Sequence, residues 1–95
     1  MLFKWLRRVL ENLDEEATYI AKDSPRMAAE FVLHMRGSAA MLVDQPNRGR
    51  PGRIVGTREL FVTRFSYVLP YRVRGGSVEI LRLFHTDKKW PKQMS

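Results

Sequence analysis

The chain contains no cysteine, and each half of it contains a single histidine. Without cysteine, a disulfide, a thiol nucleophile, an iron–sulfur cluster and a cysteine-ligated zinc site are all excluded. Neither a metal-binding spacing of two histidines and a carboxylate nor a glycine-rich phosphate loop after a strand is present. The sequence therefore predicts a protein that works without a metal or another cofactor.

Long hydrophobic runs are also missing. The longest unbroken apolar run, Ala39–Val43, is far shorter than the ~20 residues that a membrane-spanning helix needs. Lys4, Arg7 and Arg8 interrupt the stretch that would form the apolar centre of a signal peptide. We therefore expect no membrane association and a cytoplasmic location.

Acidic residues are scarce in the second half of the chain. Residues 48–95 hold eleven basic and three acidic side chains, a net charge of +8, whereas residues 1–47 have a net charge of −1. A field of positive sign attracts polyanions and acidic proteins. We therefore expect the second half to bind nucleic acid, a ribosome or an acidic protein partner.

The first half has the period of helices. Apolar residues recur every three or four positions from Leu6 to Ile20, which predicts a helix that ends near Asp23. Ser24-Pro25 is typical of a helix start, and the second helix is expected to run to Leu42. The first helix ends near Asp23 and the second begins at Ser24-Pro25, so the connection between them is very short and makes the two helices antiparallel. Met1–Trp5 is either a first strand or an early start of the first helix.

The second half changes to the period of strands after a loop over Asn47–Gly56. Two consecutive glycines predict a tight hairpin between the last two strands. Pro70 cannot donate to a ladder, so it should lie at a bulge or on an unpaired side. The expected strands are Arg58–Arg64, Tyr67–Arg74 and Ser77–His85.

This order predicts one α+β domain over residues 1–95. It is a two-layer sandwich of (β)ααβββ order, with the helix hairpin packed on a mostly antiparallel sheet. Nothing in the chain remains to cover the second sheet face, so that basic face is the expected binding surface.

Four stretches, taken in order, resemble the RelE/ParE toxin superfamily of bacterial type II toxin–antitoxin systems. They are LENLDEEATYIAK, GRPGRIVGTREL, YVLPYRV and VEILRLFHTDKKWP, and the resemblance covers roughly residues 5–91. Family members share a small βααβββ sandwich and are neutralised by an antitoxin that wraps over the toxin. The resemblance implies a growth-arresting toxin that forms a hetero-oligomer with an acidic, amphipathic cognate antitoxin.

The resemblance leaves the target open. The run YRV…VEILR..H is closer to ParE-like members, which poison DNA gyrase without chemistry and would use the helix hairpin and the C-terminal tail for target contacts. The alternative is a RelE-like, metal-independent endoribonuclease that cuts mRNA on the ribosome. A third reading is a basic nucleic-acid-binding module without toxicity.

If the chain is a ribonuclease, the expected catalytic residues are His85, Arg82 and Arg64. Metal-free cleavage needs an acid or base and cations that stabilise the charge on the phosphate, and arginine suits the second role. A lone histidine at a strand end is also typical of a structural residue. Strand alternation would place Arg82 with Ile80 and Phe84, either paired with a helix carboxylate or on the uncovered face.

Seven further residues are expected to bind the target or RNA. Four arginines cluster around the Gly/Pro loop, and Arg58 could instead pair with Glu59 or with another neighbour. Most aromatic residues should be core, with Tyr71 the expected exposed exception because its hydroxyl can meet a backbone group or a phosphate. The set is Arg48, Arg50, Arg53, Arg58, Tyr71, Lys88 and Lys89.

Overall fold

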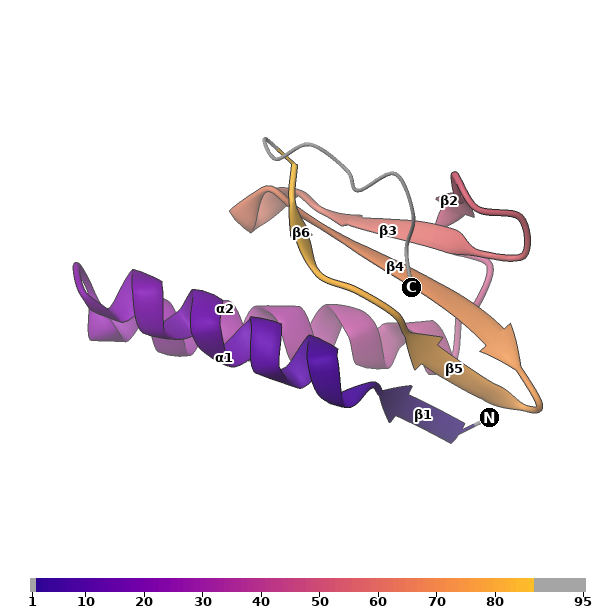
Figure 1. The fold of residues 1–95 in the computed structure, drawn as a ribbon, viewed down its shortest axis with the longest axis horizontal. Helices are drawn as coiled ribbons and strands as arrows, with labels where there is room; N and C mark the ends of the chain where they lie inside the picture. The colour runs from indigo at the N-terminus through magenta and orange to yellow at the C-terminus, as the bar shows by residue number, and fades with distance from the viewer. Residues whose placement is uncertain (1, 87–95) are drawn as a thin grey trace.

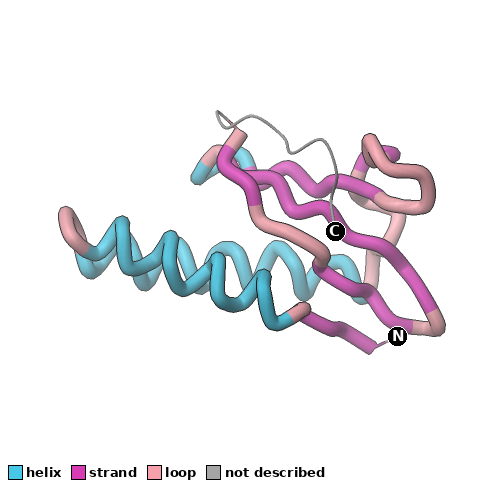
Figure 2. The backbone as a smooth tube through the Cα atoms, viewed as in Figure 1, coloured by secondary structure: helices cyan, strands magenta, loops and turns pink. Residues whose placement is uncertain are grey.

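Two antiparallel helices form one layer of the molecule and a twisted sheet forms the other (Figure 1). The computed structural model describes residues 2–86. Figure 2 shows the helix pair on one side of the strands and the two loops that flank β2 (Arg50–Pro51) at one end of the sheet. The elements are β1 (Leu2–Trp5), α1 (Arg7–Ala21), α2 (Pro25–Ala40), β2 (Arg50–Pro51), β3 (Arg58–Val62), β4 (Tyr67–Arg74), β5 (Ser77–Ile80) and β6 (Phe84–His85). The predicted α+β fold is confirmed.

The helix hairpin forms where the sequence predicts it. Residues 2–5 are a strand, and α1 begins after Leu6 without a side-chain cap. The Ser24 hydroxyl accepts a hydrogen bond from the Met27 N–H at 3.1 Å, and Pro25 occupies the first position of α2. This cap satisfies a helix-terminal donor, so α2 starts at a fixed residue. Neither helix of the described residues is long and apolar enough to cross a membrane.

The sheet is mostly antiparallel. Its strand order is β1-β5-β4-β3-β2, β6 also pairs with β4, and the pair of β1 with β5 is parallel. Gly75 and Gly76 have φ angles of 57° and 74°, which a tight hairpin between β4 and β5 requires. Residues 50–51, expected to be loop, form the short edge strand β2.

Two predicted strands are shorter than the sequence suggests. β3 ends at Val62, and residues 63–65 form a 3₁₀ turn that leads to Ser66 at a φ of 59°. The expected strand Ser77–His85 is divided into β5 and β6 by residues 81–83. The division lies opposite Pro70, whose carbonyl accepts from the Leu81 N–H at 2.9 Å but which has no N–H to return. Pro70, expected at a bulge or on an unpaired side, lies in the central strand β4: it pairs with Glu59 of β3 on one side and faces the interruption at residues 81–83 on the other.

This division also changes which side chains reach the core. Val78 and Ile80 are fully buried as expected, but Leu83 is 7% exposed and joins the core cluster, so the simple alternation through Arg82 is wrong. The Arg82 guanidinium lies over the ring of Phe84, 5.2 Å from its centroid. Because residues 81–83 are irregular, Leu83 joins Val78 and Ile80 in the core, and Arg82 does not continue the side of the strand on which Ile80 lies.

The core lies between the helix hairpin and one face of the sheet. Phe31 of α2 is fully buried and its ring contacts Phe65 and Tyr67. The other core side chains come from both helices, the 3₁₀ turn that follows α2, strands β3 to β5 and residues 81–83: Val9, Leu13, Met35, Ala39, Leu42, Leu60, Val62, Leu69, Tyr71, Val78, Ile80 and Leu83. Burial of these side chains is the main stabilising contribution to the fold.

The second sheet face is only partly open. Strand alternation places Glu59, Val68 and Pro70 on the face opposite the helices, yet Glu59 is 6% exposed, Val68 1% and Pro70 less than 2%. The expectation of a bare face is therefore wrong at its centre. Arg50 covers part of this face, because its guanidinium lies 4.2 Å from the centroid of the Phe61 ring.

Candidate functional site

His85 lies in β6, beside the part of β4 that faces α1. Its ring packs edge-on against Tyr67, with centroids 5.1 Å apart and an interplanar angle of 84°. The Tyr67 hydroxyl donates a hydrogen bond to Glu16 Oε1 of α1 at 2.8 Å. A cavity of about 240 Å³ adjoins this group, lined by Asn12, Glu15, Glu16, Arg82, Leu83, Phe84 and His85. His85 and Arg82, predicted together as catalytic residues, thus line one cavity.

The hydroxyl of Tyr67 is held in its protonated form. Burial raises the pKa of this phenol, and the hydrogen bond to Glu16 together with the negative charge of that carboxylate raises the pKa further. Tyr67 therefore does not act as a base near neutral pH. It connects the sheet to α1 and orients Glu16 next to His85.

Replacing Tyr67 by Phe is expected to lower the free energy of unfolding by about 1.5 kcal/mol at neutral pH, because the hydrogen bond to a carboxylate is lost. The raised pKa also predicts an alkaline effect. Above about pH 10 the unfolded chain loses the phenolic proton while the folded chain keeps it, so stability falls as pH rises. Urea unfolding at pH 7 and pH 10.5 should show a smaller alkaline loss in the variant. An unchanged loss would contradict this assignment.

Arg64 lies apart from the other two predicted catalytic residues. Its Nη2 is 3.3 Å from Glu30 Oε2 of α2, and its guanidinium lies over Phe65. In the described part of the chain, residues 2–86, His85 lines two cavities, and Arg64 lines neither of them. The structure therefore brings together two members of the predicted trio, not three.

The arginine-rich loop is held by hydrogen bonds between its backbone and side chains of β3. Arg58 Nη1 donates to the backbone carbonyls of Asn47 at 3.3 Å and Gly49 at 2.7 Å, so of the two suggested partners, Glu59 or another neighbour, these bonds do not involve Glu59. Consecutive strand residues point to opposite faces, which separates Arg58 from Glu59. Arg58 therefore fixes the path of the loop.

Glu59 instead binds Arg53. Its Oε2 accepts from the Arg53 backbone N–H at 2.9 Å and lies 3.9 Å from Arg53 Nε. Arg48 donates to the Gln45 side chain at 3.0 Å, and Arg50 lies over Phe61. The guanidinium groups of Arg48 and Arg50 remain on the surface, where they also line a shallow cavity beside β3.

Tyr71 does not lie on the surface. It is fully buried, and its hydroxyl donates to the Pro46 carbonyl at 2.6 Å and accepts from the Gly49 N–H at 2.9 Å. The predicted backbone contact is confirmed, whereas the expected exposure is wrong because the ring fills the core between β4 and the loop. The predicted contacts of Lys88 and Lys89 lie outside the described residues.

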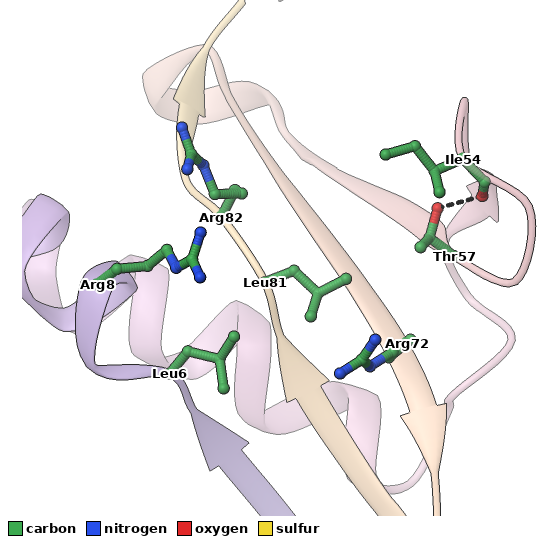
Figure 3. A pocket seen from close by; sticks show the side chains of 7 residues that line it. All are labelled: Leu6, Arg8, Ile54, Thr57, Arg72, Leu81 and Arg82. Atoms are coloured by element: carbon green, nitrogen blue, oxygen red, sulfur yellow. Dashed lines mark hydrogen bonds between the residues drawn. The ribbon is translucent and has the colours of Figure 1, made fainter. Parts of the chain in front are cut away.

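A second cavity, of about 190 Å³, lies over β4 and residues 81–82 (Figure 3). In Figure 3 the side chain of Arg8 extends toward the segment that carries Arg82, the guanidinium of Arg82 points away from Arg8, and Arg72 lies beyond Leu81. Arg72 Nε donates to Glu79 Oε1 at 2.6 Å, and this bond lowers the pKa of the Glu79 carboxyl. The described lining residues are Leu6, Arg8, Ile54, Thr57, Arg72, Leu81 and Arg82.

Sequence reasoning missed Arg8 and Arg72 as site residues. A usable signal was the alternation of Pro70, Arg72 and Arg74 along one face of β4. No comparable signal joined Arg8 to them, since it lies 64 positions before Arg72. Among residues 2–86, no group of three His, Cys, Asp or Glu side chains could hold a metal ion.

Known proteins share both the sequence pattern and the fold. Residues 3–90 match the family model described as the ParE toxin of the type II toxin–antitoxin system parDE. The chain is 42% identical over 89 residues to "Putative toxin Y4kP" of Sinorhizobium fredii, covering 94% of this chain and 92% of that protein. It is 36% identical over 84 residues to Toxin RelE2 of Caulobacter vibrioides, covering 88% of this chain and 93% of that protein.

A solved structure agrees with these relatives. A chain of the chromosomal ParDE toxin–antitoxin system from P. aeruginosa superimposes with a TM-score of 0.82 at 29% identity, covering 92% of this chain and 97% of that one. The family match covers all the described residues but Leu2, and so includes both helices, five complete strands and most of β1. The chain therefore belongs to the ParE family of toxins of type II toxin–antitoxin systems, within the RelE/ParE superfamily.

Proposed function

We propose that this toxin arrests growth by binding and inhibiting DNA gyrase without cleaving a bond, and that a cognate antitoxin neutralises it in the cytoplasm. The family match to ParE supports the choice of target. The observation that carries the proposal is the composition of the cavity at His85, which holds two carboxylates and a single arginine.

A cavity of this composition suits RNA cleavage poorly. Glu15 and Glu16 line it together with His85, and carboxylates repel the phosphates of an RNA strand. A metal-free ribonuclease needs cations around the scissile phosphate, where charge builds up in the transition state. Arg64, which could have added a second cation, is bound to Glu30 of α2 instead. The arrangement favours a structural role for His85.

The helix hairpin offers a surface that could contact a protein target. Leu10 and Tyr19 of α1 are 45% and 67% exposed, and Leu33 of α2 is 72% exposed. Leu33 also lines an apolar groove with Phe3 and Trp5 of β1. Leu10 and Tyr19 do not line this groove, but exposed apolar side chains such as Leu33 beside a groove are typical of protein–protein contacts. This surface supports inhibition by binding.

One observation favours the alternative, a RelE-like endoribonuclease that cuts ribosome-bound mRNA. Arg82 and His85 line the same cavity, so a cation and a general acid or base could act on one phosphate. The relative named Toxin RelE2 is consistent with this alternative. The two functions differ in whether His85 is required.

Replacing His85 by Ala separates the two functions. We expect the variant to arrest growth as fully as the wild type and to leave cellular mRNA uncut, because the proposed inhibition needs no proton transfer at His85. Growth after induction and primer-extension mapping of mRNA 5′ ends measure the two outcomes.

His34→Ala is the matched control, because this histidine of α2 packs beside Phe65 and lines neither cavity at His85. Thermal unfolding of both variants checks that they fold. If wild-type induction produced codon-phased cuts that His85→Ala alone abolished together with growth arrest, the ribonuclease function would replace gyrase inhibition.

A further inference from the structure

We propose that the cavity between Arg8, Arg72 and Arg82 is a carboxylate-binding site that receives an acidic side chain of the antitoxin. This inference rests on the proposed toxin–antitoxin pairing but not on the identity of the toxin's target. The three arginines come from the first turn of α1, from β4 and from the segment between β5 and β6. The fold thus assembles the site from parts of the chain that are remote in sequence.

The ionisable side chains that line this cavity all carry positive charge. Every ionisable side chain that lines it in the described part of the chain is an arginine. The first turn of α1 contains no acidic residue, and Lys4 and Arg74 add positive charge near Glu79. Glu79 occupies the Nε of Arg72, which leaves the two terminal amino groups of that guanidinium for another acceptor.

The lining of the cavity suits a carboxylate, because three arginines contribute to it. Arg8, Arg72 and Arg82 line the same cavity, and like charges at one cavity cost free energy unless an anion binds there (Figure 3). Each guanidinium can donate two parallel hydrogen bonds to a carboxylate. An anion bound here would therefore be held by more than one arginine at once.

The walls favour a peptide over a nucleic acid. Leu6, Ile54 and Leu81 line the cavity with apolar surface, which matches the aliphatic stem of a glutamate or aspartate side chain. A volume of about 190 Å³ is below the range of roughly 300–1,000 Å³ typical of small-molecule pockets, so it admits a single side chain. A nucleic-acid strand instead needs an extended basic groove with exposed aromatic side chains.

Antitoxin binding by purified wild-type and variant toxins tests the site. Arg8→Gln and Arg82→Gln are each expected to weaken binding at least tenfold, mainly through faster dissociation, because a buried carboxylate loses a partner. Arg82→Lys should weaken antitoxin binding less than Arg82→Gln, because lysine keeps the positive charge but cannot donate two parallel hydrogen bonds to a carboxylate. Arg7→Gln is the matched control: it removes the same charge from the same helix turn, is exposed and does not line the cavity.

The identity of the bound group comes from the antitoxin side. Changing each acidic residue of the antitoxin to its amide in turn should reveal one residue whose loss is not additive with Arg82→Gln, as expected for contacting groups. The same toxin variants are titrated with a 12-nucleotide single-stranded RNA. Arg7→Gln and Arg82→Gln should weaken RNA binding by the same amount, because each removes one positive charge.

Three results would overturn the assignment. The first is an Arg7→Gln loss as large as that of Arg82→Gln, which indicates general electrostatic attraction. The second is the absence of any coupled acidic residue in the antitoxin, and the third is an Arg82→Gln effect confined to RNA. Gyrase inhibition is measured separately from antitoxin affinity, so failure of this site and failure of the proposed target give different results.

Discussion

Replacing Phe31 by Ala is expected to lower the free energy of unfolding by about 4 kcal/mol. Phe31 is fully buried, and its ring lies 5.3 Å from the Phe65 ring and 5.0 Å from the Tyr67 ring, measured between centroids. Truncation removes the contacts that join α2 to the sheet and leaves a cavity. In a domain of this size the midpoint of thermal unfolding should fall by roughly 15–30 °C.

The loss of stability in Phe31→Ala follows from lost packing. An apolar replacement larger than alanine should therefore keep much of the wild-type stability. Phe31→Leu fills most of the space and is expected to cost about 1.5 kcal/mol. Urea unfolding monitored by circular dichroism measures both values. A loss below 1 kcal/mol for Phe31→Ala would show that α2 does not depend on this contact.

The second large effect is expected at Tyr71. Tyr71→Phe should lower the free energy of unfolding by about 3 kcal/mol, because the Gly49 N–H and the Pro46 carbonyl each lose their hydrogen bond to the hydroxyl. Both groups belong to the loop that precedes β2. The loop cannot simply move, since the Gly49 Cα already approaches the Tyr71 ring so closely that an added Cβ would lie 2.6 Å from Cε1.

Tyr19→Phe is the control for Tyr71→Phe. Tyr19 is 67% exposed on α1, so removal of its hydroxyl is expected to change stability by less than about 0.5 kcal/mol. Amide hydrogen exchange should show faster exchange at Gly49 and Arg50 in Tyr71→Phe. Equal stabilities of the two variants would contradict the role of Tyr71 in holding the loop.

Local signals made much of the fold predictable from the sequence. Ser24 followed by Pro25 fixes the start of α2 because both the cap and the first helical position are written in adjacent residues. Gly75-Gly76 fixes the last hairpin for the same reason. The division of the expected strand Ser77–His85 was not predictable, because it depends on Pro70, which lies in the neighbouring strand and acts through pairing.

The site was less predictable than the fold. Strand composition identified Arg82 and His85 as residues of interest, but their environment depends on carboxylates that α1 contributes from Glu15 and Glu16. A tyrosine can stack on a ligand at the surface or fill the core, and the sequence does not distinguish the two. Only the packing of the loop against Tyr71 shows that it is buried. Residue type and spacing thus identify chemical groups, whereas burial and partners follow from contacts between distant segments.

Inhibition of the target by binding rather than by catalysis is what we propose for this toxin. A titration of purified DNA gyrase with the purified toxin, read as supercoiling of relaxed plasmid, tests that proposal most directly. We predict loss of supercoiling at toxin-to-gyrase ratios close to one, full recovery when the antitoxin is added, and the same curve for His85→Ala. Unchanged supercoiling at a large excess of toxin, with mRNA cut in a translating extract under the same conditions, would contradict the account.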